Sequence, residues 1–350
     1  MYYDRTMTAE FVHADAPARV YWEITRACAL ACRHCRAEAT PFADPGELDH
    51  AAGIALLRQL ATADPKPHVV LTGGDPLERS DVFDLIAAGR GAGLHMSVSP
   101  SATPRLTGDV IARLKDAGVE AISLSIDGST AAKHDEIRKV EGTFARTLTA
   151  AARAREVGLM FQVNTLVSAE TRGDLAQIDA LVRRLAAARW SLFFLVTIGR
   201  GAVLQPIDAA ATEELLVWLA ERATIRPGPV VTTTEAPFFR RVVATRGTTD
   251  PARGHAAGIR DGNGVMFVGH DGAVYPSGFL PVSAGNVKTE HPLAIYRESA
   301  MFRALRDVDS FRGRCGRCEF RAACGGSRAR AWTATGDMLG EDPLCAFQPP

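Results

Sequence analysis

With 350 residues, of which 47% are hydrophobic and 23% charged, the chain can bury a large core and carry a small additional domain. Its 40 basic and 40 acidic side chains cancel, so the overall charge favours neither a nucleic acid nor an anionic membrane as a partner. Charges are scattered through residues 1–18 and no apolar run reaches membrane length, so we expect no signal peptide and no anchor, and a cytoplasmic protein.

Short apolar runs alternate with amphipathic stretches from residue 20 to about residue 198. The expected strands are 20–24, 68–71, 95–99, 121–126, 160–167 and 190–198. The expected helices are 48–61, 81–91, 108–117, 143–157, 171–187 and 209–223. This series predicts an α/β fold with a parallel sheet and helical crossovers, and six units suit a partial (β/α)6 barrel better than a closed eight-unit barrel.

The composition changes at Arg226-Pro227-Gly228-Pro229, which indicates a domain boundary. We therefore expect a leader over 1–19, a barrel over 20–228 and a small C-terminal domain over 229–350. In the last part a strand is expected at 230–235 and a hairpin at 265–275, around the turn signal Asp271-Gly272. His255, in a glycine-rich stretch, is either a substrate contact or a solvated side chain.

Three cysteines, Cys28, Cys32 and Cys35, follow the first expected strand with the spacing CxxxCxxC. In a wrapped loop they can converge on one cubane of four irons, and three thiolates leave the fourth iron open for another ligand. On a helix the same spacing would place them on one face, as small buried side chains or as part of a zinc site. Both alternatives stay open at this point.

Small and polar residues stand where the next strands end, which is where parallel α/β folds place their functional groups. Gly73 and Gly74 allow close backbone approach and Asp75 can accept from an ammonium group, although a plain turn before Pro76 has the same pattern. Arg138 is either a carboxylate ligand or a salt-bridged helix end. The candidate cofactor-binding residues are Gly73, Gly74, Asp75, Ser99, Ser123, Ser125, Asp127, Arg138 and Asn164.

A second cysteine group lies near the end of the chain: Cys315, Cys318, Cys324 and Cys345. Four thiolates can ligate every corner of a cubane or hold one zinc ion. In a reducing compartment, two such groups indicate two metal centres and argue against disulfides.

In combination these motifs resemble the radical S-adenosylmethionine (radical SAM) superfamily, in the branch with a C-terminal SPASM or twitch domain. The resemblance implies a [4Fe-4S] cluster on Cys28, Cys32 and Cys35 whose open iron binds the methionine part of S-adenosylmethionine. Asp75 stands where a glutamate usually ends the motif that holds the methionine amine. Arg138 corresponds to the arginine that pairs with the cofactor carboxylate, and the strand with Ser123 and Ser125 to a ribose site.

The same resemblance implies one auxiliary [4Fe-4S] cluster on the second cysteine group. An inner auxiliary cluster is not expected, because Ser277 and Arg328 stand where full SPASM domains carry cysteines. The cluster would relay electrons or hold the fold.

The reaction implied is reductive cleavage of S-adenosylmethionine to a 5′-deoxyadenosyl radical, which takes a hydrogen atom from a substrate carbon. The needed partner is a low-potential electron donor such as ferredoxin or flavodoxin. The tail around Cys324 and Cys345 looks most like the heme-related branch, which predicts side-chain modification or decarboxylation of a tetrapyrrole. A peptide maturase, a dehydrogenase of a small intermediate, and a non-catalytic electron-transfer or zinc-stabilised binding protein are the alternatives.

Overall fold

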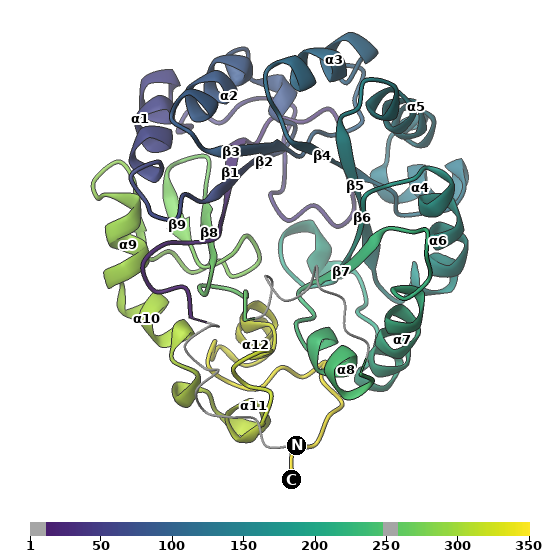
Figure 1. Cartoon of the computed structure of the whole chain (residues 1–350), viewed down its shortest axis with the longest axis vertical. Helices are drawn as coiled ribbons and strands as arrows, with labels where there is room; N and C mark the ends of the chain where they lie inside the picture. Colours follow the sequence, from purple (N-terminus) through teal and green to yellow (C-terminus); the bar gives the residue numbers. More distant parts are fainter. Residues whose placement is uncertain (1–11, 248–257) are drawn as a thin grey trace.

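A single curved sheet runs through the molecule, with most helices packed on its outer side (Figure 1). The computed structural model describes residues 12–247 and 258–350. The strands are β1 (Arg19–Thr25), β2 (His68–Gly73), β3 (His95–Val98), β4 (Ala121–Ser125), β5 (Met160–Val167), β6 (Arg189–Phe194), β7 (Val230–Thr234), β8 (Val265–Val268), β9 (Ala273–Tyr275) and β10 (Gly285–Asn286). Their order in the sheet is β10-β9-β8-β1-β2-β3-β4-β5-β6-β7.

In the described residues, helices connect the successive strands from β1 to β8, and the remaining helices follow β10. The helices are α1 (His50–Leu60), α2 (Val82–Gly91), α3 (Gly108–Asp116), α4 (Ala131–Arg138), α5 (Thr143–Glu156), α6 (Leu175–Arg184), α7 (Ala209–Arg222), α8 (Phe239–Thr245), α9 (Pro292–Glu298), α10 (Ala300–Arg306), α11 (Gly313–Arg317) and α12 (Arg328–Thr335). Side-chain oxygens of Asp49, Thr107 and Asp208 cap α1, α3 and α7, and each accepts a bond from a first-turn amide.

Alternation along β1 shows how the sequence builds the core. Val20, Trp22 and Ile24 are fully buried on the helix side of the sheet. The Trp22 ring lies against Gly53 of α1, where an added Cβ would come within 2.8 Å of the ring. Glu23, on the opposite side of the strand, is buried toward the interior of the barrel. The apolar face therefore fixes which side chains β1 presents to the site.

The α/β fold with a mostly parallel sheet is confirmed, and the expected hairpin is present as β8 and β9. Two element boundaries were wrong. The expected strand 190–198 ends at Phe194, because β7 pairs only as far as Phe193. The expected helix 171–187 begins with a 3-10 turn, Arg172–Asp174, and becomes α-helical at Leu175.

The sheet does not stop at the expected domain boundary after residue 228. β7 pairs in parallel with β6, and β8 pairs in parallel with β1 at the other edge. These two strands extend the six-stranded arrangement that the sequence predicts, so the boundary stays a prediction. The expected leader lies partly, and His255 wholly, outside the described residues.

Within residues 12–247 and 258–350, no helix combines the length and the apolar character that crossing a bilayer requires.

Candidate functional site

The first cysteine group lies in a loop that leaves β1 and folds back on itself. The amide of Cys28 donates to the carbonyl oxygen of Thr40 (2.8 Å), and the amide of Thr40 donates to that of Arg26 (3.0 Å). Residues 26–40 contain no helix, so the alternative in which the thiols share one helix face is wrong. All three cysteines instead line one hollow of roughly 1080 Å³, its open mouth included.

Gly73 and Gly74 are needed for contact with the cysteine loop. Gly73 has φ +147°, and an added Cβ would lie 2.3 Å from the carbonyl oxygen of Thr25. A Cβ on Gly74 would lie 2.3 Å from the carbonyl oxygen of Ala27, just before Cys28. The two glycines therefore let β2 approach the start of the loop and still line the hollow.

The surroundings of the three thiols suit cluster ligands. The amide of Leu30 lies 3.3 Å from Cys28 Sγ, and the amide of Ala39 lies 3.4 Å from Cys35 Sγ. Burial raises the pKa of Cys28 to about 11 and also raises that of Cys32. A metal has to displace these protons, and N–H groups directed at sulfur are a recurring feature of iron–sulfur sites.

Asp75 has a different position from the one expected of an amine ligand. Its side chain is fully buried and is not among the residues lining the hollow. One carboxylate oxygen accepts from the amides of Leu77 and Ser101 (both 3.2 Å), and the other from the hydroxyl of Thr103 (2.8 Å). The carboxylate ties the end of β2 to the loop after β3, and its expected contact with a methionine amine stays a prediction.

The other expected contacts converge better. Ser99, Ser125, Asp127, Arg138 and Asn164 all line the hollow together with the three cysteines. Ser123, two residues before Ser125 on the same side of β4, does not line it, because it lies one pleat deeper. The individual roles of these side chains as cofactor contacts stay predictions.

Arg138 and Asp127 form a buried ion pair at the wall of the hollow. Arg138 Nη2 lies 2.5 Å from Asp127 Oδ2, and Arg138 Nη1 lies 3.7 Å from Cys32 Sγ. Asp127 Oδ1 accepts from the amide of Leu166 (2.7 Å). Although burial opposes ionisation, the guanidinium lowers the pKa of Asp127 to about 2. The pair thus connects α4, β4 and the cysteine loop.

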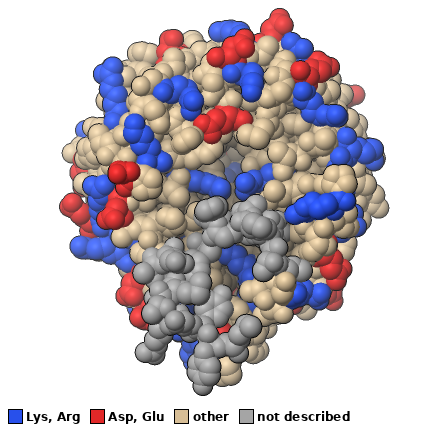
Figure 2. Space-filling view, viewed as in Figure 1, with Lys and Arg blue, Asp and Glu red and all other residues tan. Residues whose placement is uncertain are grey.

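Two arginines at this site were missed from the sequence. Arg200 donates to the carbonyl oxygens of Cys32 (2.9 Å) and Ala39 (2.8 Å), and so holds the loop in shape. Arg36 pairs with Glu23 (2.8 Å) and lies over the ring of Phe267, 4.5 Å from its centroid. Basic side chains are visible around the hollow of the face shown in Figure 2. The contacts of Arg200 span more than 160 residues, so no local pattern signals them.

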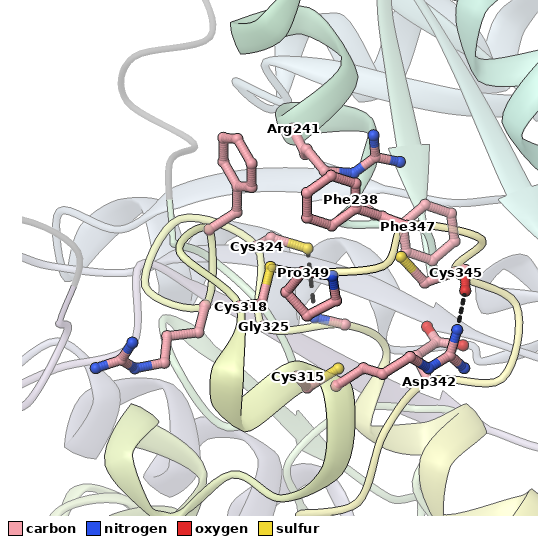
Figure 3. Close-up of a pocket in the computed structure, with 14 residues that line it drawn as sticks. Phe238, Arg241, Cys315, Cys318, Cys324, Gly325, Asp342, Cys345, Phe347 and Pro349 are labelled. Atoms are coloured by element: carbon pink, nitrogen blue, oxygen red, sulfur yellow. Dashed lines mark hydrogen bonds between the residues drawn. The ribbon is translucent and has the colours of Figure 1, made fainter. Parts of the chain in front are cut away.

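The second cysteine group lines another hollow, of roughly 430 Å³ with its opening included. Cys315, Cys318, Cys324 and Cys345 surround it, with the rings of Phe238 and Phe347 as apolar walls (Figure 3). Burial raises the pKa of Cys324 to about 12, and the amide of Gly326 lies 3.4 Å from its sulfur. In the described residues, no set of His, Cys, Asp and Glu is grouped closely enough to hold a single metal ion. All seven cysteines are free.

The two residues that replace expected cysteines have contacts of their own. Ser277 is buried, and its hydroxyl accepts from the amide of Phe279 (3.2 Å). Arg328 is fully buried, and its Nη2 lies 3.4 Å from Cys315 Sγ. Arg328 therefore belongs to the surroundings of the four-cysteine hollow.

Glu235 and Asp261 form a buried acidic pair. The Ser327 hydroxyl donates to Glu235, at the end of β7, and Asp261 accepts from the amides of Arg328 (3.0 Å) and Ala329 (2.9 Å). Burial and the neighbouring Asp261 carboxylate raise the pKa of Glu235 well above its usual value. Glu235 is therefore protonated in the folded protein at pH values where the unfolded chain has ionised it.

We expect Glu235→Gln to make stability less sensitive to rising pH. Above pH 4.5 the folded state binds more protons than the unfolded chain, so the free energy of unfolding falls as the pH rises toward the raised pKa. Urea unfolding from about pH 5 to about pH 8 is expected to favour the variant over the parent increasingly. Glu214→Gln, at an exposed carboxylate, is the control, and parallel profiles for parent and Glu235→Gln would contradict the assignment.

Comparison with known proteins gives a consistent picture. Residues 22–193 match the family model of the radical SAM superfamily. The chain is 37% identical to the AdoMet-dependent heme synthase of Nitratidesulfovibrio vulgaris, covering 94% of this chain and 92% of that protein. It is 35% identical to the AdoMet-dependent heme synthase of Methanosarcina barkeri, covering 96% and 98%. In fold it resembles Streptococcus suis SuiB bound to its precursor peptide SuiA, with a TM-score of 0.75, 15% identity and coverage of 98% and 78%.

Proposed function

The chain belongs to the radical SAM superfamily, and we propose that it modifies the carboxylate side chains of a heme-type tetrapyrrole. The observation that carries this proposal is the identity of 37% and 35% to two heme synthases over more than nine-tenths of both chains. The heme-related likeness of the C-terminal tail points the same way.

Bound in the first hollow, a [4Fe-4S] cluster and S-adenosylmethionine supply a 5′-deoxyadenosyl radical, which can take a hydrogen atom from an unactivated carbon. The residues of the chain position these groups. Cys28, Cys32 and Cys35 provide three ligands, while Gly73 and Gly74 keep the end of β2 against their loop.

Arginines near the first hollow support a substrate that carries carboxylates. Arg36 lines the hollow, and so do the aromatic residues Phe193 and Phe279. An aromatic surface next to a guanidinium suits a flat ring system with acidic side chains. We propose that Arg36 faces the substrate, while Arg138 and Arg200 hold the cysteine loop.

We further propose that Cys315, Cys318, Cys324 and Cys345 hold an auxiliary [4Fe-4S] cluster, and that ferredoxin or flavodoxin reduces the enzyme. The free thiols around one hollow support the cluster, and seven free cysteines suit the reducing cytoplasm. Iron analysis separates the possibilities: about eight irons per chain fit two cubanes, while about four irons with one zinc fit a mixed protein.

Incubation with a deuterated tetrapyrrole tests the substrate. An iron porphyrin with deuterium on its propionate side chains is combined with the anaerobically reconstituted enzyme, dithionite and S-adenosylmethionine. Mass spectrometry is expected to find deuterium in 5′-deoxyadenosine and loss of carbon dioxide from the porphyrin.

A porphyrin without carboxylate side chains is the control and should yield no labelled nucleoside. Unlabelled 5′-deoxyadenosine from the deuterated substrate would contradict the tetrapyrrole assignment and leave the superfamily chemistry intact. Absence of 5′-deoxyadenosine altogether would contradict both.

A further inference from the structure

Three arginines lie near the four-cysteine hollow, although none of them is among the residues that line it. Arg260 and Arg328 are buried, and Arg240 is half-buried. Among the described residues, no carboxylate lies within ion-pair distance of any of these three guanidinium groups. A buried charge without a counter-charge is costly, so this arrangement calls for an explanation.

Arg328 makes the closest contact with the cysteines. Its Nη2 is 3.4 Å from Cys315 Sγ, and its Nη1 donates to the carbonyl oxygens of Gly340 (2.6 Å) and Met338 (3.2 Å). The guanidinium also lies over the ring of Phe311, 4.7 Å from its centroid. These contacts fix the direction of the N–H group that points at sulfur.

Arg260 and Arg240 also donate to backbone carbonyl oxygens, and Arg260 lies over the same Phe311 ring as Arg328, 5.2 Å from its centroid. Arg260 donates to Gly258 (3.0 Å) and Leu305 (3.3 Å), and Arg240 donates to Ala323 (2.9 Å), next to Cys324. Carbonyl oxygens satisfy the N–H groups but leave the positive charges in place. Burial lowers the pKa of Arg240 to about 10 and that of Arg260 to about 9, and the nearby Cys324 acts in the opposite direction on both.

We infer that Arg240, Arg260 and Arg328 are the counter-charge of an anionic iron–sulfur cluster on the four cysteines, and that they favour its reduced form. This inference rests on the auxiliary cluster proposed above. Four thiolates give such a cluster a net negative charge, and reduction by one electron makes that charge larger. Nearby positive charge and N–H groups directed at sulfur therefore raise the reduction potential.

Arg328 is then a positioning residue for the cluster, at a place where full SPASM domains carry a cysteine. Its N–H group touches the thiol of Cys315, whereas the other two act through charge. A raised potential suits a centre that takes up an electron better than one that delivers it at low potential.

A redox titration of the auxiliary cluster tests this inference. Cys28, Cys32 and Cys35 are replaced by alanine in the full-length chain, so that the remaining signal comes from the second cysteine group. The midpoint potential is followed by electron paramagnetic resonance in this background and with Arg328→Gln added. We expect the reduction equilibrium to become at least tenfold less favourable, a shift of about 59 mV to more negative values for one electron.

Arg306→Gln is the matched control. Arg306 is also buried and donates to carbonyl oxygens, of Tyr296 (2.8 Å) and Arg297 (3.0 Å), but none of its contacts is a cysteine. The midpoint potential of the auxiliary cluster in this variant should equal that in the chain with only the three cysteine replacements. Arg328→Lys keeps the charge but not the planar fork, and a smaller shift is expected.

The possible outcomes distinguish a failure of the counter-charge role from a failure of the auxiliary-cluster proposal. Absence of iron and sulfide from the background chain would overturn the auxiliary cluster itself. Normal iron content with an unchanged potential in Arg328→Gln would overturn the inference alone. Loss of iron in Arg328→Gln but not in Arg306→Gln would support the counter-charge role.

Discussion

Replacing Cys28, Cys32 or Cys35 by alanine is expected to reduce the formation of 5′-deoxyadenosine from S-adenosylmethionine to below detection. The three thiols line one hollow, and a cubane with an open iron needs all three. Each variant should fall from about eight to about four irons per chain, because the second cysteine group is unchanged. Chromatography of the nucleoside products and iron analysis under anaerobic conditions provide the two measurements.

Cys318→Ala is the matched control, since it removes a thiol from the other hollow. It should lose iron as well but keep cleavage of S-adenosylmethionine, because the loop of residues 26–40 retains its contacts with Gly74 and Arg200. If any of the three alanine variants in the first loop made 5′-deoxyadenosine at the parental rate, the assignment of that loop would be wrong.

The strands and both cysteine groups could be predicted from the sequence because their signals are local. Alternating apolar residues identified β5 at Met160–Val167 without error, and cysteine spacing identified thiols that share a hollow. The end of β6 was placed too late. Leu195, Val196 and Ile198 are apolar because they line the first hollow, and apolar composition alone cannot separate that role from a strand.

Long-range contacts could not be predicted. The pairing of β8 with β1 joins residues almost 250 positions apart, and nothing in the sequence of either strand indicates that the two strands pair. The glycine motif indicated that Asp75 could accept from an ammonium group, but it did not indicate the contacts that its carboxylate makes with Thr103 and the amide of Ser101. A local motif predicts that a polar group is needed at a site; only the packing around it decides which way the group points.

For the arginines around the last cysteines, too, the packing of the fold decides which side chains are buried and which are exposed. Many arginines precede and follow the last cysteines, and arginine side chains are mostly exposed in proteins. The structure buries Arg328 and leaves Arg312 exposed, with its guanidinium paired to Asp337. The sequence marks Arg328 only as a residue that replaces an expected cysteine, whereas its burial without a carboxylate identifies it as a functional candidate.

Arg138→Met is expected to lower the free energy of unfolding by about 3–5 kcal/mol, because it leaves the buried carboxylate of Asp127 without its partner. Only 1% of the Asp127 side chain and 12% of the Arg138 side chain are exposed, so solvent does little to screen the pair. Anaerobic urea unfolding of the reconstituted protein measures the change.

The double variant Asp127→Asn/Arg138→Met is the control that separates the unpaired charge from the general loss of a side chain. Asparagine can still accept from the amide of Leu166, and methionine fills much of the same space, so the double variant should recover most of the lost stability. If Arg138→Met lowered the free energy of unfolding by less than about 1 kcal/mol, the Arg138–Asp127 pair would behave like a solvent-exposed ion pair, and the prediction would be wrong.

The pH dependence provides an independent check on the same pair. The folded-state pKa of Asp127 is about 2 and its usual value is 3.8, so the stabilisation is complete above pH 3.8 and is lost as the pH falls toward 2. The parent should therefore lose its advantage over the double variant in this acidic range. Because Arg138 also contacts Cys32, a cluster that stays intact in the double variant would show that neither this contact nor the ion pair is needed to hold the cluster.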